Sequence, residues 1–412
     1  MLLKIGEAVT NDFDTLPIYS DIITCNVDSN GNIVANYGEE DFAFDGSNGN
    51  VMTSFPEFYI YKRNVEGEEY EYIKISNDPL PGYRKISPTL IDRYDSGLGD
   101  NVLTSKSGEI PCVEKSIVVD RTLAKARGTG YGLLDINFYD ALCCLYLVEY
   151  ATYNSQAALG NGITNMRYNN SDVALIAEVN TNRFIVNTTG GNAFIVGQTI
   201  SIGTSSIGNF GVATGRKIIE INDYNESDIT GKEIIFDGNP VDIALTNVIW
   251  SSGQHSGGCD TLGMKSGCLA NDSKHAVIYR GVENIFGNVW QWVDGVNIRD
   301  NQAWVCNNPE EYRSNKFEAP YEQLGYINAN KNGYSTKLGF DSNHPEVNFP
   351  IELGGSVNTY MCDEYYQLTG DKVACVGSCL NNGNNAGLWS WHLHLDSGGM
   401  FGTRGARCIK YQ

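Results

Sequence analysis

The stretch YRGVENIFGNVWQWVDGVNI, residues 279–298, is the part of the chain that decides the fold. Glycines punctuate it, and glycine suits tight turns and close backbone approach; they are Gly281, Gly287 and Gly295. Between the last two lies a bulky apolar block that needs a core around it, formed by Val289, Trp290, Trp292 and Val293. We expect the charges beside this block to be paired or hydrogen-bonded; they are Arg280, Glu283 and Asp294.

A second stretch, GLWSWHLHLDSGGMFGTRGARCIKY at 387–411, alternates in polarity. One parity is apolar and holds Trp389, Trp391, Leu393 and Leu395. The other parity is polar and holds Ser390, His392, His394 and Asp396. A period of two predicts a strand with one face on the core and the other face free. The sequence therefore predicts that these four polar side chains point to solvent.

Together the two stretches resemble the C-type-lectin-like fold, in the branch that formylglycine-generating enzymes share with phage tail proteins. GNVWQW at 287–292 is close to the GNVWEW signature of that branch, and GGS at 354–356 and FGTRGARC at 401–408 look like its closing strands. A fuller resemblance, through 48–62, 147–162 and 279–298, is to phage and prophage tail receptor-binding proteins. The resemblance implies an α+β, C-type-lectin-like fold with long irregular loops.

Changes in composition divide the chain into four segments. We expect an N-terminal β segment at 1–45 and the first part of the lectin-like domain at 46–168. A small all-β barrel or sandwich is expected as an insertion at 169–250, where aromatic residues nearly vanish and Val, Ile and Thr alternate with Gly and Asn. The second part of the host domain, at 251–412, would carry the variable ligand-binding face. The ends of the inserted unit should lie close together.

The strongest helical pattern runs over 135–150. Asp135 or Asn137 can cap this helix, and its apolar side chains recur at i, i+4 spacing. A shorter helical piece is predicted at 122–127.

Overall charge and hydropathy exclude some partners. The 412 residues carry a net charge of −20 at pH 7, and phosphate binding needs basic patches, so we expect no nucleic acid. No apolar run approaches the ~18 residues that span a bilayer, so we expect no membrane insertion. The opening MLLKIGEAV is too short in its apolar part to predict a signal peptide.

Eleven cysteines are expected to be free or buried thiols, with a disulfide in a released particle as the alternative. Neither Cys259 with Cys268 nor Cys375 with Cys379 has the CxxC spacing of a zinc site. The cysteine pair of formylglycine-generating enzymes lies near the C-terminus, but its surroundings are not recognisable here, and Leu353 replaces the arginine before GGS. The resemblance therefore supports fold rather than catalysis, and we expect no enzyme.

Two interpretations compete for the polar parity of the last strand. His392, His394 and Asp396 share one face, and imidazole and carboxylate groups are suitable ligands for a transition metal. Alternatively, they are exposed recognition residues. We expect recognition, with no metal and no cofactor.

An Asn-rich run precedes this strand, and paratope loops use Asn, Ser and Gly beside Tyr anchors in the same way. The region resembles the variable part of diversity-generating retroelement proteins, in which adenine-directed mutagenesis yields Asn, Tyr, Ser, His and Asp. The expected ligand-binding residues are Tyr360, Asp363, Tyr365, Asn381, Asn382, Asn384, Asn385, Ser390, His392, His394, Asp396, Met400 and Thr403.

The resulting hypothesis is a receptor-binding, host-adhesion protein made in the host cytoplasm and carried in a phage or prophage tail. Its expected partners are a host cell-surface protein or glycan and other tail proteins, and it would be a monomer or a trimer. The alternatives are a relative of the formylglycine-generating oxidases and a structural tail or baseplate part without a ligand.

Overall fold

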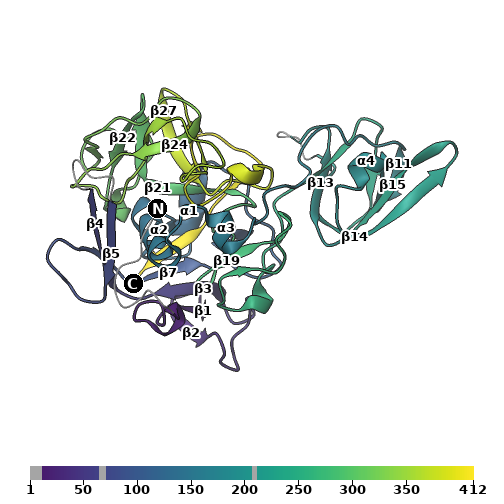
Figure 1. Cartoon of the computed structure of the whole chain (residues 1–412). Coiled ribbons are helices and arrows are strands. Elements are labelled where there is room, and N and C mark those ends of the chain that lie inside the picture. Colours follow the sequence, from purple (N-terminus) through teal and green to yellow (C-terminus); the bar gives the residue numbers. More distant parts are fainter. Residues whose placement is uncertain (1–11, 65–70, 207–210) are drawn as a thin grey trace.

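The computed structural model in Figure 1 describes residues 12–64, 71–206 and 211–412. Residues 1–11, on which the expectation of no signal peptide rests, lie outside this described part. Strands make up 37% of the structure and helices 12%, so the predicted α+β, C-type-lectin-like fold is wrong and the molecule is β-rich. The physical reason is that short strands pair over most of the chain, including the polar segment 299–350 that lacks a clear period.

The helices of the described part are few and mostly short. They are α1 (Ile117–Lys125), α2 (Ile136–Tyr150), α3 (Ser155–Leu159) and α4 (Thr188–Gly191). Asp135 caps α2 as predicted, because its carboxylate accepts the backbone N–H of Phe138 at 2.9 Å. The predicted piece at 122–127 begins earlier than expected, since Ser116 caps α1 and places Ile117 in the core.

One sheet has six antiparallel strands that come from both ends of the chain. Their spatial order is β10 (Tyr131–Leu133), β30 (Cys408–Tyr411), β7 (Thr89–Asp92), β3 (Asn50–Phe55), β1 (Ile23–Val27) and β2 (Ile33–Asn36). Strands β1 and β2 of the N-terminal segment therefore lie in the same sheet as β3, which follows that segment.

A second sheet has nine strands and carries both stretches that the sequence singled out. Its order is β23 (Glu322–Gln323), β22 (Gln302–Val305), β21 (Trp290–Arg299), β27 (Asp371–Val376), β28 (Trp391–Leu395), β26 (Glu364–Gln367), β24 (Gly333–Leu338) and β25 (Pro350–Leu353), with β29 (Arg404–Gly405) beside β21. The β26–β28 and β21–β29 pairs are parallel. Residues 354–356 follow β25 and are not a closing strand as the resemblance implied.

Three smaller sheets complete the main body. They are β5 (Glu71–Ser76), β4 (Phe58–Asn64) and β6 (Arg84–Ile86); β18 (Gly267–Cys268), β19 (Val277–Tyr279) and β20 (Val282–Glu283); and β8 (Gly97–Gly99) with β9 (Val102–Thr104).

The described residues between 169 and 250 form a lobe that projects from the main body (Figure 1). Its sheets are β12 (Arg183–Val186), β15 (Ile229–Phe236), β14 (Ala213–Glu226), β13 (Thr199–Gly203) and β17 (Val248–Ser251), and the pair β11 (Glu178–Thr181) and β16 (Val241–Ile243). The lobe has a core of its own, built from side chains between Ala174 and Ile249. The chain enters and leaves at one place, where the Ser251 N–H donates to the Arg167 carbonyl at 2.7 Å.

Helix α2 is the centre of the main core. The sequence predicts one apolar face for α2, but eleven of the helix's side chains, from Ile136 to Leu147, are buried on all sides of it. Phe138 contacts Phe55 of β3, and Tyr139 contacts Trp391 of β28, so the helix packs on both large sheets. Of the described residues, no helix is long and apolar enough to cross a membrane.

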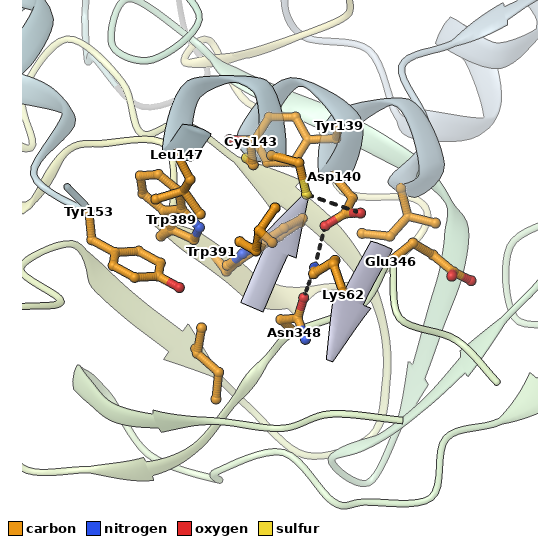
Figure 2. Close-up of a pocket in the computed structure, with 14 residues that line it drawn as sticks. Lys62, Tyr139, Asp140, Cys143, Leu147, Tyr153, Glu346, Asn348, Trp389 and Trp391 are labelled. Carbon is orange, nitrogen blue, oxygen red and sulfur yellow. Dashed lines mark hydrogen bonds and ion pairs between the residues drawn. The ribbon is translucent and has the colours of Figure 1, made fainter. Parts of the chain in front are cut away.

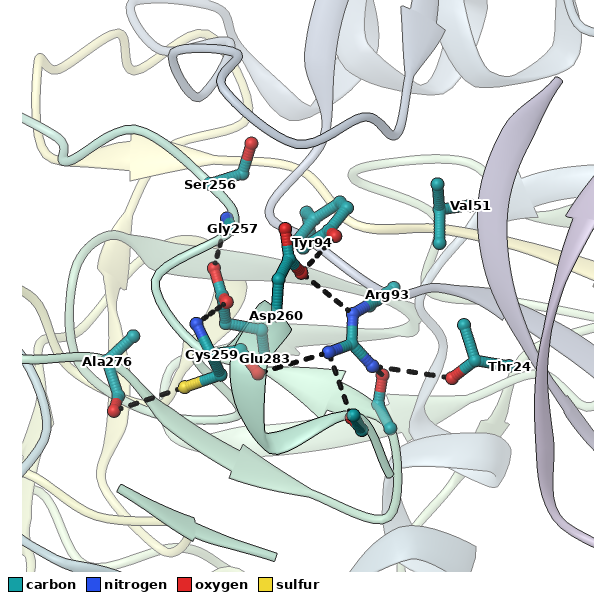
Figure 3. Close-up of polar contacts among 12 residues, drawn as sticks. Thr24, Val51, Arg93, Tyr94, Ser256, Gly257, Cys259, Asp260, Ala276 and Glu283 are labelled. Atoms are coloured by element: carbon teal, nitrogen blue, oxygen red, sulfur yellow. Dashed lines mark hydrogen bonds and ion pairs between the residues drawn. The ribbon is translucent and has the colours of Figure 1, made fainter. Parts of the chain in front are cut away.

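A buried polar network fixes the stretch 279–298 to the rest of the fold (Figure 3). Arg93 donates to the carbonyls of Gly281 (3.3 Å) and Gly263 (3.0 Å). The Glu283 carboxylate accepts the N–H groups of Gly257 (2.9 Å) and Cys259 (2.7 Å). Burial raises the pKa of Glu283 to about 7, so these two donors offset only part of the cost of burying its charge.

The other predicted partners of this stretch are also present. Arg280 pairs with Glu149 at 2.6 Å, and Asp294 pairs with Arg121 at 2.7 Å. Gly287 has φ +81°, and a Cβ there would lie 2.9 Å from the Ile163 carbonyl oxygen, so only glycine fits. Trp290 and Trp292 are both buried, as the sequence predicts.

Candidate functional site

The candidate site is the face of the nine-stranded sheet that points away from α2. In the sheet register Tyr334 lies opposite Glu364, and Tyr366 lies opposite His392. Cross-strand partners and residues two apart share a face of a sheet. We call this set the outer sheet face: Trp290, Tyr334, Glu364, Tyr366, His392 and His394.

Rings stack in a row across the middle of the outer sheet face. His392 lies flat on Trp290, with ring centroids 3.7 Å apart and an interplanar angle of 24°. His394 stacks on Tyr366 at 4.5 Å, and the two imidazoles meet edge to face at 4.9 Å. Both histidines are half-buried, so the row is open to solvent along one side.

The two imidazoles are neutral at physiological pH. Burial lowers the pKa of His392 to about 2, with His394 and Arg404 adding to the effect. Burial, Arg404 and Lys372 lower the pKa of His394 to about 4. The Nδ1 atom of each ring is buried and has no hydrogen-bond partner among the residues that the structure describes. The row therefore offers flat neutral rings with unused polar atoms.

The Asn-rich loop borders one end of the outer sheet face. Asn385 accepts from the Tyr334 hydroxyl at 2.6 Å and donates to Glu364 at 3.2 Å. Gln156 holds this loop from below by donating to the carbonyls of Gly383 (3.0 Å) and Ala386 (2.7 Å). The loop is thus hydrogen-bonded to α3 rather than hanging freely.

The thirteen sequence-predicted residues separate into three groups. The exposed ones are Tyr360, Asn381, Asn384, Asp396 and Met400. The half-buried ones are Asn382, Asn385, His392 and His394. The buried ones are Asp363, Tyr365, Ser390 and Thr403.

For Ser390 the prediction of a solvent-facing side chain is wrong. Ser390 is 0% exposed and precedes β28, which begins at Trp391. Its hydroxyl donates to the Glu364 carbonyl at 2.9 Å and accepts from Ser378 at 2.8 Å. Its polar group therefore serves the fold.

Three more of the predicted ligand-binding residues are buried: Asp363 just before β26, Tyr365 within β26, and Thr403. Asp363 accepts the Trp389 N–H at 2.9 Å, and burial raises its pKa to about 7. Tyr365 alternates with Glu364 and Tyr366, so its hydroxyl lies on the core side, 2.9 Å from the Ala329 carbonyl. Thr403 lies just before β29, where its carbonyl accepts the Trp290 N–H at 2.9 Å.

Sequence reasoning missed Tyr334 and Glu364 as members of the face and treated Trp290 as frame alone. The EYYQ run at 364–367 contained part of the signal, because alternation there places Glu364 and Tyr366 on the side opposite Tyr365. Tyr334 joins the face only through pairing between β24 and β26, which no local pattern shows.

None of the eleven cysteines forms a disulfide bond, and ten of them are buried. Burial raises the pKa of Cys375 to about 12 and also raises that of Cys379. A thiolate is therefore disfavoured at both positions. Asp396 pairs with Lys372 at 2.6 Å, and the described residues contain no group of three or more His, Cys, Asp or Glu that could hold a metal ion.

A pocket lies on the other side of β28, between α2 and the strands β4 and β5 (Figure 2). Aromatic side chains, Trp389 and Trp391 among them, line one half of it. At the polar end Lys62 pairs with Asp140 at 2.7 Å, and Arg84 pairs with the same carboxylate at 2.6 Å. Because these charged groups pair with one another, the polar end of the pocket is an internal ion-pair cluster. The pocket is therefore a weaker candidate for a ligand-binding site than the outer sheet face.

Comparison with known proteins gives no family for this chain. No model of a protein family matches it, and no curated protein is significantly similar to it.

Proposed function

We propose that this chain is a receptor-binding, host-adhesion protein of a phage or prophage tail, and that the outer sheet face is its ligand-binding surface. The observation that carries the proposal is the row of stacked rings, in which Tyr366, His392 and His394 are half-buried over the buried Trp290, and the Nδ1 atoms of the two histidines have no hydrogen-bond partner among the described residues. Rigid aromatic side chains on a sheet give a large contact area at a low cost in conformational entropy.

The separation between frame and face supports this reading. The frame depends on the buried network around Arg93 and Glu283, whereas the His392 and His394 side chains make ring contacts, and their Nδ1 atoms have no hydrogen-bond partner in the described part of the chain. Side chains on such a face can vary while the frame stays folded. This is the property that a retroelement-diversified protein needs.

The alternative of an oxidase relative is less well supported. That chemistry needs reactive cysteines, and burial raises the pKa of both Cys375 and Cys379. A purely structural tail part would bury or discard a face of this kind in assembly.

The first test is adsorption to a panel of bacterial strains by the purified protein. We expect His392→Ala with His394→Ala to abolish adsorption while the melting temperature stays nearly unchanged. His275→Ala is a matched control, since His275 pairs with Asp272 on an exposed loop away from the face. Adsorption that survives the double change, or that the control removes equally, contradicts the proposal.

A second test reads the diversification directly. Sequencing the gene across a population should find substitutions concentrated at codons for Tyr366, His392, His394 and the Asn-rich loop. Codons for Trp391 and Leu393, whose side chains lie in the core, should stay constant. Substitutions spread evenly over both parities of β28 would argue against a diversified face.

A further inference from the structure

Among the residues that the structure describes, Arg404 is a buried cation without a carboxylate partner. The buried arginines of the described part are Arg93, Arg280, Arg404 and Arg407. Three have a carboxylate: Arg407 pairs with Asp95 at 2.9 Å, Arg280 with Glu149 at 2.6 Å, and Arg93 with Asp260 at 3.5 Å. Arg404 is 7% exposed, and no carboxylate oxygen of the described residues lies within 4.0 Å of it. Charged side chains are almost never this buried unless they are paired.

The guanidinium lies at the outer sheet face. Strand β29 runs parallel to β21 and places Arg404 directly beside Trp290, on whose ring His392 stacks. The Phe401 ring covers the guanidinium at 4.4 Å. The Arg404 Nε atom has no hydrogen-bond partner in the described part of the chain, and the same holds for the Nδ1 atoms of both histidines.

The groups around Arg404 supply no counter-charge. Burial raises the pKa of the Cys375 and Cys379 thiols, so both stay neutral. Both histidines are neutral as well, and the guanidinium's side-chain contacts with the Thr403 hydroxyl, at 3.4 Å, and with the Cys375 thiol bring it no negative charge. The chain has 49 acidic residues against 29 Lys and Arg. The missing partner therefore does not reflect a shortage of carboxylates, and a buried unpaired charge is costly.

We propose that Arg404 binds a carboxylate group of the ligand at the outer sheet face, between the rings of His392 and Phe401. The inference rests on the proposed function in one respect, that this face binds the ligand. A guanidinium presents N–H groups in a fork that matches a carboxylate. With one positive charge and neutral neighbours, the site matches the single charge of a carboxylate better than a phosphate, which carries roughly −1.5 to −2.

The test uses acetate as the probe and the histidine side chains as reporters. The full chain is labelled with ¹⁵N-histidine, and the signals of His392 and His394 are assigned with single His→Asn variants. We expect acetate to shift these two signals saturably, while chloride at equal ionic strength leaves them unmoved. Arg404→Gln should weaken the acetate response at least tenfold. Arg299→Gln, which removes an exposed arginine of the same sheet, should leave it intact.

Arg404→Lys separates loss of the binding group from loss of folding, because it keeps the positive charge but lacks the forked N–H groups of the guanidinium. We expect a weaker but saturable acetate response from it. No response to acetate in the unaltered protein, a response to inorganic phosphate but not acetate, or an undiminished response in both Arg404 variants each overturns the carboxylate site. If adsorption is lost in the His392→Ala, His394→Ala variant but kept in Arg404→Gln, the proposed function is supported. Only the carboxylate site at Arg404 is then contradicted.

Discussion

Arg407 shows how a single residue holds the frame behind the candidate site. Its guanidinium pairs with Asp95 at 2.9 Å and donates to the carbonyls of Glu283 (2.7 Å) and Asp92 (2.9 Å). We expect Arg407→Met to lower the free energy of unfolding by about 3–5 kcal/mol, because it leaves Asp95 buried without its cation. Chemical denaturation measures the change.

Arg299 provides the matched control for that experiment. It pairs with Asp371 at 2.7 Å, but both side chains are well exposed. Arg299→Met should therefore change the free energy of unfolding by no more than about 1 kcal/mol. Equal losses in the two variants would show that burial does not decide the role of Arg407.

The two site histidines predict a sensitivity to acid. Their pKa values in the folded protein, about 2 and about 4, lie below the ordinary 6.5, so between pH 6.5 and about 4 the unfolded chain binds more protons. Stability should therefore fall as the pH drops through this window. The charged and titratable groups around the rings are Arg404, Lys372 with its partner Asp396, Tyr366, which contacts both rings, and Cys375, which lies opposite His392 in the sheet register.

The measurement is the melting temperature at pH 7 and at about pH 4.5, the lower part of that window. Asp363 and Glu283 have raised pKa values of about 7, so they act in the opposite direction and favour the folded state as the pH falls. Because they are the same in both proteins, the difference between the parent and the His392→Asn, His394→Asn variant isolates the histidines. We expect the variant to lose less stability, or gain more, on acidification, and an identical response would contradict the assignment.

At the scale of elements, β28 divides its side chains between fold and site. Trp391 is buried and contacts Tyr139 and Phe349, whereas His394 is half-buried on the opposite face. We expect Trp391→Ala to cost about 3–5 kcal/mol of stability, as large aromatic truncations do. His394→Ala should cost about 1 kcal/mol or less. Denaturant unfolding of both variants checks which face of β28 lies on the core. If His394→Ala lowers the stability more than Trp391→Ala, the two faces are assigned the wrong way round.

Local pattern predicts these elements well where one residue type decides the outcome. The alternation of β28 and the Asp135 cap of α2 could both be read from the sequence. The start of α1 could not, because the β-branched run Ile117–Val119 favours strand locally and is helical here through the Ser116 cap and burial of Ile117. The prediction that Ser390 faces solvent is wrong for a similar reason, since its burial depends on the neighbouring strand β26.

At the scale of the molecule, the features that could not be predicted from the sequence are those set by strand pairing between distant segments. Strand β30 at the C-terminal end lies between β7 and β10, and no local period shows this. The same holds for the outer sheet face, whose Tyr334 and Trp290 come from strands far from β28 in sequence. The resemblance implied an α+β fold, whereas the pairing of many short strands makes the molecule β-rich.

The lobe at 169–250 gives the last prediction. Its core draws on its own residues, from Ala174 to Ile249, and the chain leaves the main body at Arg167 and returns at Ser251, whose N–H donates to the Arg167 carbonyl at 2.7 Å. A Gly-Ser turn of roughly two to four residues can therefore replace the lobe without moving either end. We expect the shortened chain to fold with one cooperative calorimetric transition. Its stability should fall by about 1–3 kcal/mol, because the buried Gln254 loses its hydrogen bonds to Thr199, at 2.8 and 3.0 Å. Adsorption should persist, since the lobe contributes no residue to the outer sheet face. A soluble shortened chain without a cooperative transition would instead make the lobe part of the main fold, and a folded one that no longer adsorbs would move the binding surface onto the lobe.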